Sequence, residues 1–102
     1  MALPYYYDYA AHAFRFYAEN MHQRSRLGIL SKAEIQNWNC VLRTLNKFSK
    51  TEQNLVLEMN RYEGTIGDCV RAMREKYAIP VVDIWDLTNR VFDEFARQRG
   101  LI

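Results

Sequence analysis

Residues 49–64, S-K-T-E-Q-N-L-V-L-E-M-N-R-Y-E-G, contain a complete set of helix signals. Ser49 and Glu52 have the S-x-x-E spacing of a capping box, in which each side chain bonds to the backbone N–H group of the other residue. Apolar side chains then recur at helical spacing, and Gly64 is a natural stop because glycine tolerates a left-handed backbone. The stretch therefore predicts an amphipathic helix. Its expected buried side chains are Leu55, Val56, Met59 and Tyr62.

Similar signals stand on both sides of this stretch. Ser31 and Glu34 form a second S-x-x-E pair upstream, and Thr65 can cap a further helix with Asp68 three residues later. Each pair is followed by apolar side chains at helical spacing. The expected buried faces comprise Ile35, Trp38, Val41, Leu42 and Leu45 after the first pair, and Ile66, Cys69, Val70, Met73 and Tyr77 after the second.

Two prolines mark the first and last predicted helices. The first helix follows Pro4 and should end before the polar residues 22–26 and Gly28, which predict a loop. Pro80 disfavours helical geometry at the residue before it but suits a first turn, so the last helix should begin near Pro80 and end at Gly100. The expected inner faces are Tyr6, Tyr9, Ala10, Ala13, Phe14, Tyr17 and Met21 in the first helix, and Val81, Ile84, Trp85, Thr88, Val91, Phe92 and Phe95 in the last.

These patterns predict an all-α fold with about five helices in one compact domain over residues 1–102. The length is that of a single domain, and 49% hydrophobic with 25% charged residues is typical of a folded chain. Within this domain we distinguish N-terminal helices (residues 1–47) from a C-terminal part (residues 48–102).

The formal net charge of +2 is unevenly distributed. Residues 1–48 contain six basic and three acidic side chains, a net charge of +3, whereas residues 49–102 contain eight basic and nine acidic ones, a net charge of −1. The basic excess therefore belongs to the first part. The sequence has neither an apolar run long enough to span a membrane nor a secretory signal, so we expect a cytoplasmic protein without membrane contact.

No catalytic or cofactor motif is recognisable. His12 and His22 are far in sequence from Cys40 and Cys69, which we interpret as reduced core thiols. Asp8 and His12 are four residues apart, but two ligands without a third make a weak metal site. The four glycines match no phosphate-binding loop. We therefore expect no enzyme, metal, cofactor or small-molecule substrate.

A cluster of tyrosines precedes and opens the first predicted helix. It consists of Tyr5, Tyr6, Tyr7 and Tyr9. Tyrosine is common at protein interfaces because it combines a large apolar ring with a polar tip, and one helix face cannot bury all four rings. Two interpretations remain open: packing in the core and at its boundary, or a surface for self-association or for a partner.

The C-terminal part resembles region 4 of bacterial sigma factors and the small sigma-like regulators of phages and integrated elements. The resemblance rests on the order of features in residues 48–102. First comes a capped helix that ends at an aromatic-x-Gly corner, Y-E-G. It is followed by a scaffold helix, T-I-G-D-C-V-R-A-M-R-E-K-Y, then by the turn A-I-P, and then by a longer helix with a basic end, V-V-D-I-W-D-L-T-N-R-V-F-D-E-F-A-R-Q-R-G. The resemblance implies that the last two helices form a helix-turn-helix pair that binds duplex DNA, with RNA polymerase as a further partner.

The resemblance also implies residue roles. Val70 and Met73 would lie against Ile84 and Thr88. The side chains facing the major groove near the start of the last helix would be Val82, Asp83, Asp86, Asn89 and Arg90. Further candidate DNA contacts are Arg71, Arg74, Lys76, Arg97 and Arg99.

Two functions therefore remain open: a DNA-binding or transcription-associated regulator, and a helical protein–protein interaction module or oligomer without DNA binding. DNA binding usually needs a net basic surface, whereas the C-terminal part is slightly acidic. A continuous positive stripe on the exposed face of the last helix would favour the first function, and a mixed or acidic face the second.

Overall fold

The computed structural model describes residues 3–21 and 30–102, and within them the chain is all-α and forms a single domain. Among the described residues there are five helices and no strand. The loop predicted for residues 22–26 and Gly28 lies outside the described residues. The helices are α1 (Tyr7–Asn20), α2 (Lys32–Leu45), α3 (Lys50–Arg61), α4 (Ile66–Tyr77) and α5 (Val81–Arg99).

Three helices begin at the predicted caps. At the start of α2, the Ser31 Oγ accepts from the Glu34 backbone N–H at 3.2 Å, and the Glu34 carboxylate accepts from the Ser31 N–H at 2.9 Å. The same reciprocal bonds open α3 and α4. The backbone donor at each cap is the main reason why the pKa of the capping carboxyl lies below its ordinary value in Glu34, Glu52 and Asp68.

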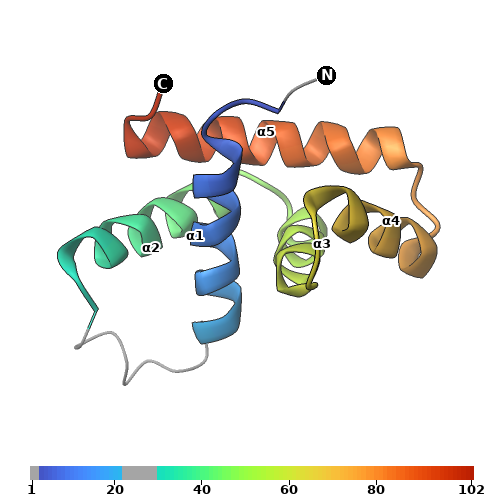
Figure 1. Cartoon of the computed structure of the whole chain (residues 1–102), viewed down its shortest axis with the longest axis horizontal. Helices are drawn as coiled ribbons and strands as arrows, with labels where there is room; N and C mark the ends of the chain where they lie inside the picture. The colour runs from blue at the N-terminus through green and yellow to red at the C-terminus, as the bar shows by residue number, and fades with distance from the viewer. Residues whose placement is uncertain (1–2, 22–29) are drawn as a thin grey trace.

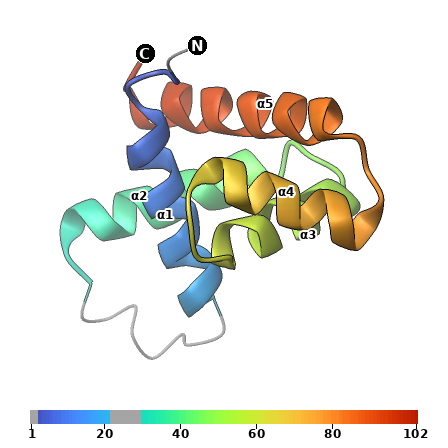
Figure 2. The same cartoon turned by 45° about the vertical axis from the view of Figure 1, so that its right-hand side comes forward.

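A turn of three residues, 78–80, joins α4 to α5. Ala78 ends α4 in a left-handed conformation, with φ 55° and ψ 37°. Pro80 then precedes the first residue of α5, as its position in the sequence predicted. Figures 1 and 2 show that this turn lies at one end of the molecule and returns the chain along α4.

The longest helix, α5, contacts most of the others. The segment before α1 crosses α5, while α2 and α4 pack along different parts of its length (Figure 1). Phe92 and Phe95 are buried in the main core, and both rings lie within 5.6 Å of the Phe14 ring, centroid to centroid. A second cluster joins α3, α4 and α5, and in it Val70 and Met73 meet Ile84 as expected.

Several core assignments from the sequence need correction. Trp38 and Trp85 are only partly buried at the edges of the two clusters, and Leu87, which was not expected inside, is 5% exposed. Tyr62 and Tyr77 are 50% and 44% exposed, because Tyr62 follows the last residue of α3 in an extended conformation and Tyr77 is the last residue of α4.

The buried hydroxyl of Thr44 should lower the stability of the fold. Its side chain is fully buried, and its Oγ1 has no hydrogen-bond partner in the described part of the chain. A buried hydroxyl without a partner carries an uncompensated desolvation cost, so Thr44→Val should raise the free energy of unfolding by about 1 kcal/mol. Urea denaturation measures this change.

Thr88 provides the matched control. It is equally buried, but its Oγ1 donates to the Ile84 carbonyl at 2.8 Å. Thr88→Val should therefore lower the free energy of unfolding by about 0.5–1.5 kcal/mol. Equal changes in the two valine variants would contradict the account of Thr44.

Candidate functional site

The start of α5 exposes the residues that the sequence assigned to the major groove. Val82 is 72% exposed, and Asp83 and Asp86 are also exposed. Asn89 is exposed as well, but its Oδ1 accepts a hydrogen bond from the hydroxyl of Tyr7. The side chains exposed at the start of α5 are therefore apolar or acidic, and one of the two acids, Asp86, is paired with Arg90.

Two of the three cations of α5 are paired with acids within the protein. Arg90 bonds to Asp86 at 3.0 Å and lies 3.5 Å from a carboxylate oxygen of Glu52. Arg97 pairs with Glu94. The exposed face of α5 thus carries charges of both signs rather than a continuous positive stripe.

The three basic candidates on α4 differ from one another. Arg71 pairs with Asp68, and Lys76 pairs with Glu58 of α3. Arg74 is exposed and makes no ion pair within the described residues. Of these three, Arg74 is the cation whose charge is not already matched by a carboxylate.

The structure divides the tyrosine cluster. Tyr6 and Tyr7 are buried and donate hydrogen bonds to Asp93 and Asn89 of α5. Tyr5 is 77% exposed, and Tyr9 is 39% exposed with its hydroxyl 3.0 Å from Asn37 Oδ1. Two of the four rings are thus core residues, and two remain at the surface.

The two buried tyrosines should make stability depend on alkaline pH. The pKa of Tyr6 is raised to about 12 by the hydrogen bond of its hydroxyl to Asp93 and by burial. The pKa of Tyr7 is raised to about 12 by burial and by the negative charge of Asp93. An unfolded tyrosine has a pKa of about 10, so it loses its proton first. Stability is then complete below pH 10 and falls as pH rises from 10 to 12.

This loss should reach about 1.4 kcal/mol for each tyrosine at pH 11 relative to pH 8. Urea denaturation at the two pH values measures it. Tyr7→Phe should reduce the pH-dependent loss by that amount, whatever it does to stability at pH 8. An unchanged loss in Tyr7→Phe would show that Tyr7 ionises as easily in the folded chain as in the unfolded one.

A second candidate surface lies on α2, where the sequence predicted burial. Ile35 and Leu42 are 42% and 38% exposed, so their assignment to the core was wrong. Val41 and Leu45 are buried as predicted, and the buried face of α2 also includes Cys40 and Thr44. Ile35 and Leu42 are seven residues apart and so lie on one side of the helix, separated by about 10 Å along its axis.

Beside this apolar stripe is a polar hollow of about 200 Å³ between α2 and α5. The described residues that line it are Gln36, Asn39, Cys40, Arg43, Gln98 and Arg99, none of them acidic. Arg43 donates to Gln98 Oε1 at 3.3 Å, and Arg99 donates to Asn37 Oδ1 at 2.7 Å. Neither arginine has a carboxylate partner within the described residues. The sequence singled out Arg99 alone among these residues.

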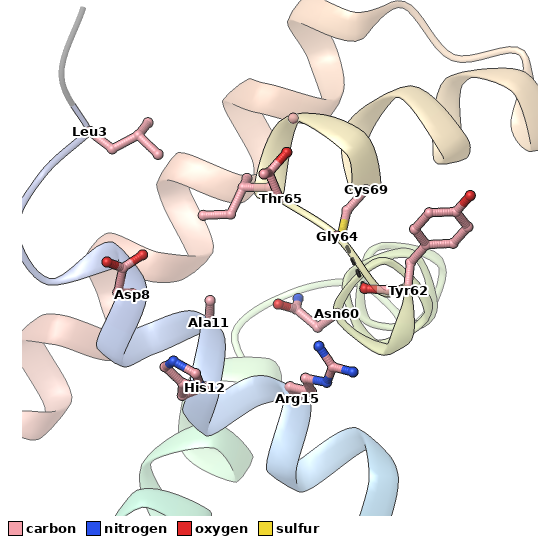
Figure 3. A pocket seen from close by; sticks show the side chains of 12 residues that line it. Leu3, Asp8, Ala11, His12, Arg15, Asn60, Tyr62, Gly64, Thr65 and Cys69 are labelled. Atoms are coloured by element: carbon pink, nitrogen blue, oxygen red, sulfur yellow. Dashed lines mark hydrogen bonds between the residues drawn. The ribbon is translucent and has the colours of Figure 1, made fainter.

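A pocket of about 370 Å³ lies between α1 and the joint of α3 and α4. Asp8, His12 and Arg15 approach it from α1, opposite Asn60 and the turn at Gly64 (Figure 3). Arg15 is bound to Glu19 at 3.0 Å and lies 3.7 Å from Glu63. Asp8 and His12 do line one pocket, but the described residues contain no group of three side chains that could hold a metal ion.

The two cysteines are buried, as expected for core thiols. Cys40 is 3% and Cys69 7% exposed. The Cys69 thiol donates to the Tyr62 carbonyl at 3.3 Å (Figure 3), and burial raises the pKa of this thiol. A buried thiol with a raised pKa is a poor nucleophile, because the thiolate is the reactive form.

Comparisons with known proteins give no match to the chain among family models, curated proteins or solved structures. In the described part of the chain, no helix is both long and apolar enough to cross a membrane.

Proposed function

We propose that this chain is a non-enzymatic protein–protein interaction module whose docking surface is the outer face of α2. The observation that carries the proposal is the apolar stripe of Ile35 and Leu42, two exposed side chains on one side of α2. Surface apolar residues scattered singly are ordinary, but a stripe along one helix edge is a feature of contact surfaces.

The composition of the α2 face supports this function. Gln36 and Asn39, which lie between Ile35 and Leu42 in the sequence, are exposed. Arg43, the residue after Leu42, is exposed and carries a positive charge. Interfaces typically combine an apolar centre, few charges and arginine. The exposed face of α5 has mixed charge, which also favours protein contact over phosphate contact.

Site-specific photo-crosslinking in cells that naturally contain the protein tests the proposal. A photoreactive residue at position 35 or 42 should give one discrete adduct, because both positions face the same partner. The control position is Val82, which is more exposed and equally apolar but lies on α5. Adducts from position 82 alone, or none from 35 and 42, would contradict the proposal, and an adduct of twice the chain mass would identify self-association.

DNA binding by a sigma region 4-like helix-turn-helix is the second candidate. It is favoured by the three-residue turn with its left-handed Ala78 and by the unpaired charge of Arg74 near that turn. Helix-turn-helix units use a turn of this length between their two helices. The acidic start of α5 opposes it, because Asp83 and Asp86 would approach phosphates.

This candidate makes a separate prediction for duplex DNA. Asp83→Asn with Asp86→Asn should strengthen non-specific binding by removing repulsion from phosphates. Arg74→Gln should weaken binding and reduce the slope of log K against log salt by about 1. Titration of a labelled genomic fragment at several salt concentrations measures both effects. Absence of binding at low salt, even with the two asparagines, would exclude the DNA-binding function.

A further inference from the structure

The hollow between α2 and α5 has the chemistry of an anion site. Two guanidinium groups from different helices, Arg43 and Arg99, line a space of about 200 Å³ together with side-chain amides. Arginine recognises carboxylates and phosphates because its planar N–H groups match their oxygen geometry. Among the described residues that line the hollow there is no acid to neutralise either charge.

Neutral partners hold both arginines in place. Gln98 and the Cys40 sulfur, at 3.3 and 3.2 Å, accept from Arg43, and Asn37 accepts from Arg99 at 2.7 Å. These contacts fix part of each guanidinium and leave its other N–H groups available, because a guanidinium has five donors. The side chains therefore need little further ordering to receive an anion.

The closest acid in this hydrogen-bond network is already compensated. Gln98 also donates to Glu94 at 3.2 Å, but Glu94 is paired with Lys47 and Arg97. Two cations share this one carboxylate. The neighbourhood of the hollow therefore has a positive balance.

The hollow and the apolar stripe belong to one continuous surface. Asn39 lines the hollow and is four residues after Ile35 and three before Leu42, so it lies beside both on the helix. Arg43 directly follows Leu42 in the sequence. An occupant that covers the stripe would thus bring its flank to the two arginines.

We propose that the occupant of this surface is an acidic amphipathic helix of a partner protein, which places apolar side chains on Ile35 and Leu42 and a carboxylate between Arg43 and Arg99. The inference rests on the proposed docking function of α2 and adds the chemistry of the partner. A helix fits because the stripe follows the axis of α2, and side chains two turns apart on a parallel helix have the same spacing. Its acidic flank complements the basic hollow.

Three labelled peptides test this partner chemistry. Each has 18 residues and the same leucine stripe, and one flank consists of Glu, Gln or Lys. Fluorescence anisotropy with the full chain should give the tightest binding for the Glu peptide, about tenfold weaker binding for the Gln peptide and weaker binding still for the Lys peptide. Tenfold corresponds to about 1.4 kcal/mol, close to the lower end of what a hydrogen bond to a charged group contributes.

Variants locate the effect. Arg43→Gln with Arg99→Gln should lower affinity for the Glu peptide about tenfold and leave affinity for the Gln peptide unchanged, so that the preference disappears. Arg43→Lys with Arg99→Lys should keep part of the preference, which separates loss of charge from loss of folding. Arg61→Gln is the matched control, because Arg61 is exposed on α3 and makes no ion pair within the described residues. It should change nothing.

The proposal is overturned if the Glu and Lys peptides bind equally, or if the preference survives loss of both arginines. A 20-base-pair DNA duplex that displaces the Gln peptide, and no longer does so in the glutamine double variant, would assign the hollow to phosphates and would also overturn it. If none of the peptides binds, the acidic helix is excluded. The crosslinks from positions 35 and 42 still decide the docking function separately.

Discussion

Replacing Phe95 by alanine should lower the free energy of unfolding by about 3–5 kcal/mol. Phe95 is fully buried, and its ring packs on Phe14 at 5.6 Å between centroids, where α5 meets α1. The loss combines the transfer of a large apolar side chain with a cavity that the surrounding helices cannot close. Domains of this size are stable by only about 5–15 kcal/mol, so the variant should unfold at much lower urea concentration.

Val82→Ala on the same helix is the control for Phe95. Val82 is 72% exposed, so its truncation should change the free energy of unfolding by less than about 0.5 kcal/mol. Truncation of Trp85 to alanine should cause a loss of unfolding free energy between these two values, because Trp85 is only partly buried. A loss below about 1 kcal/mol for Phe95→Ala would show that the junction of α1 and α5 is not the centre of the core.

Replacing Ile35 and Leu42 together by glutamine should weaken binding of the native partner about a hundredfold or more. Side chains at the centre of an interface often contribute more than 1 kcal/mol each, and two such losses of about 1.4 kcal/mol multiply to this factor. Glutamine is a good helix former, and both positions are exposed, so folding stability should change little. The affinity of the purified chain for the crosslinked partner, once identified, measures the effect.

Val82→Gln serves as the matched control for this double variant. It replaces an exposed apolar side chain on α5 and should leave affinity for the partner unchanged. Equal losses from α2 and α5 would indicate general adhesion rather than one docking surface. Unchanged affinity in the α2 double variant would remove Ile35 and Leu42 from the interface.

The helices could be predicted from the sequence because their signals are local. The capping pairs at Ser31, Ser49 and Thr65 start three helices as expected, and Gly100 stops the last one in a left-handed conformation. A cap depends on residues three positions apart and needs no information about the rest of the chain. Pro80 fixed the start of α5 for the same reason.

The choice of buried edge on α2 could not be predicted in this way. Apolar or small side chains occur on both edges, with Ile35 and Leu42 on one and Cys40 and Thr44 on the other. Helical periodicity identifies the whole stripe, but the packing of α1 and α5 decides which edge is covered. Thr44 is polar but buried, whereas the apolar Ile35 and Leu42 are exposed. Residue polarity alone therefore predicts the wrong edge.

The candidate site was missed for a related reason. Arg43 and Arg99 are 56 positions apart in the sequence, and only the packing of α2 on α5 brings them to one hollow. The sequence shows a basic excess in residues 1–48 but does not show where on the folded surface these charges lie. Conversely, it assigned Asn89 to a free surface, whereas the fold places the Tyr7 hydroxyl on its side-chain oxygen.

Hydrogen exchange of the chain, free and in the assembly recovered from its native cells, tests the docking role of α2 most directly. Exchange of exposed helix ends and lightly packed turns slows when a partner covers them. If α2 is the docking surface, we expect added protection in residues 32–45 and near Arg99 at the end of α5, with the residues around Val82 unchanged. Protection confined to residues 78–90 at the α4–α5 turn, with none in α2, would contradict it.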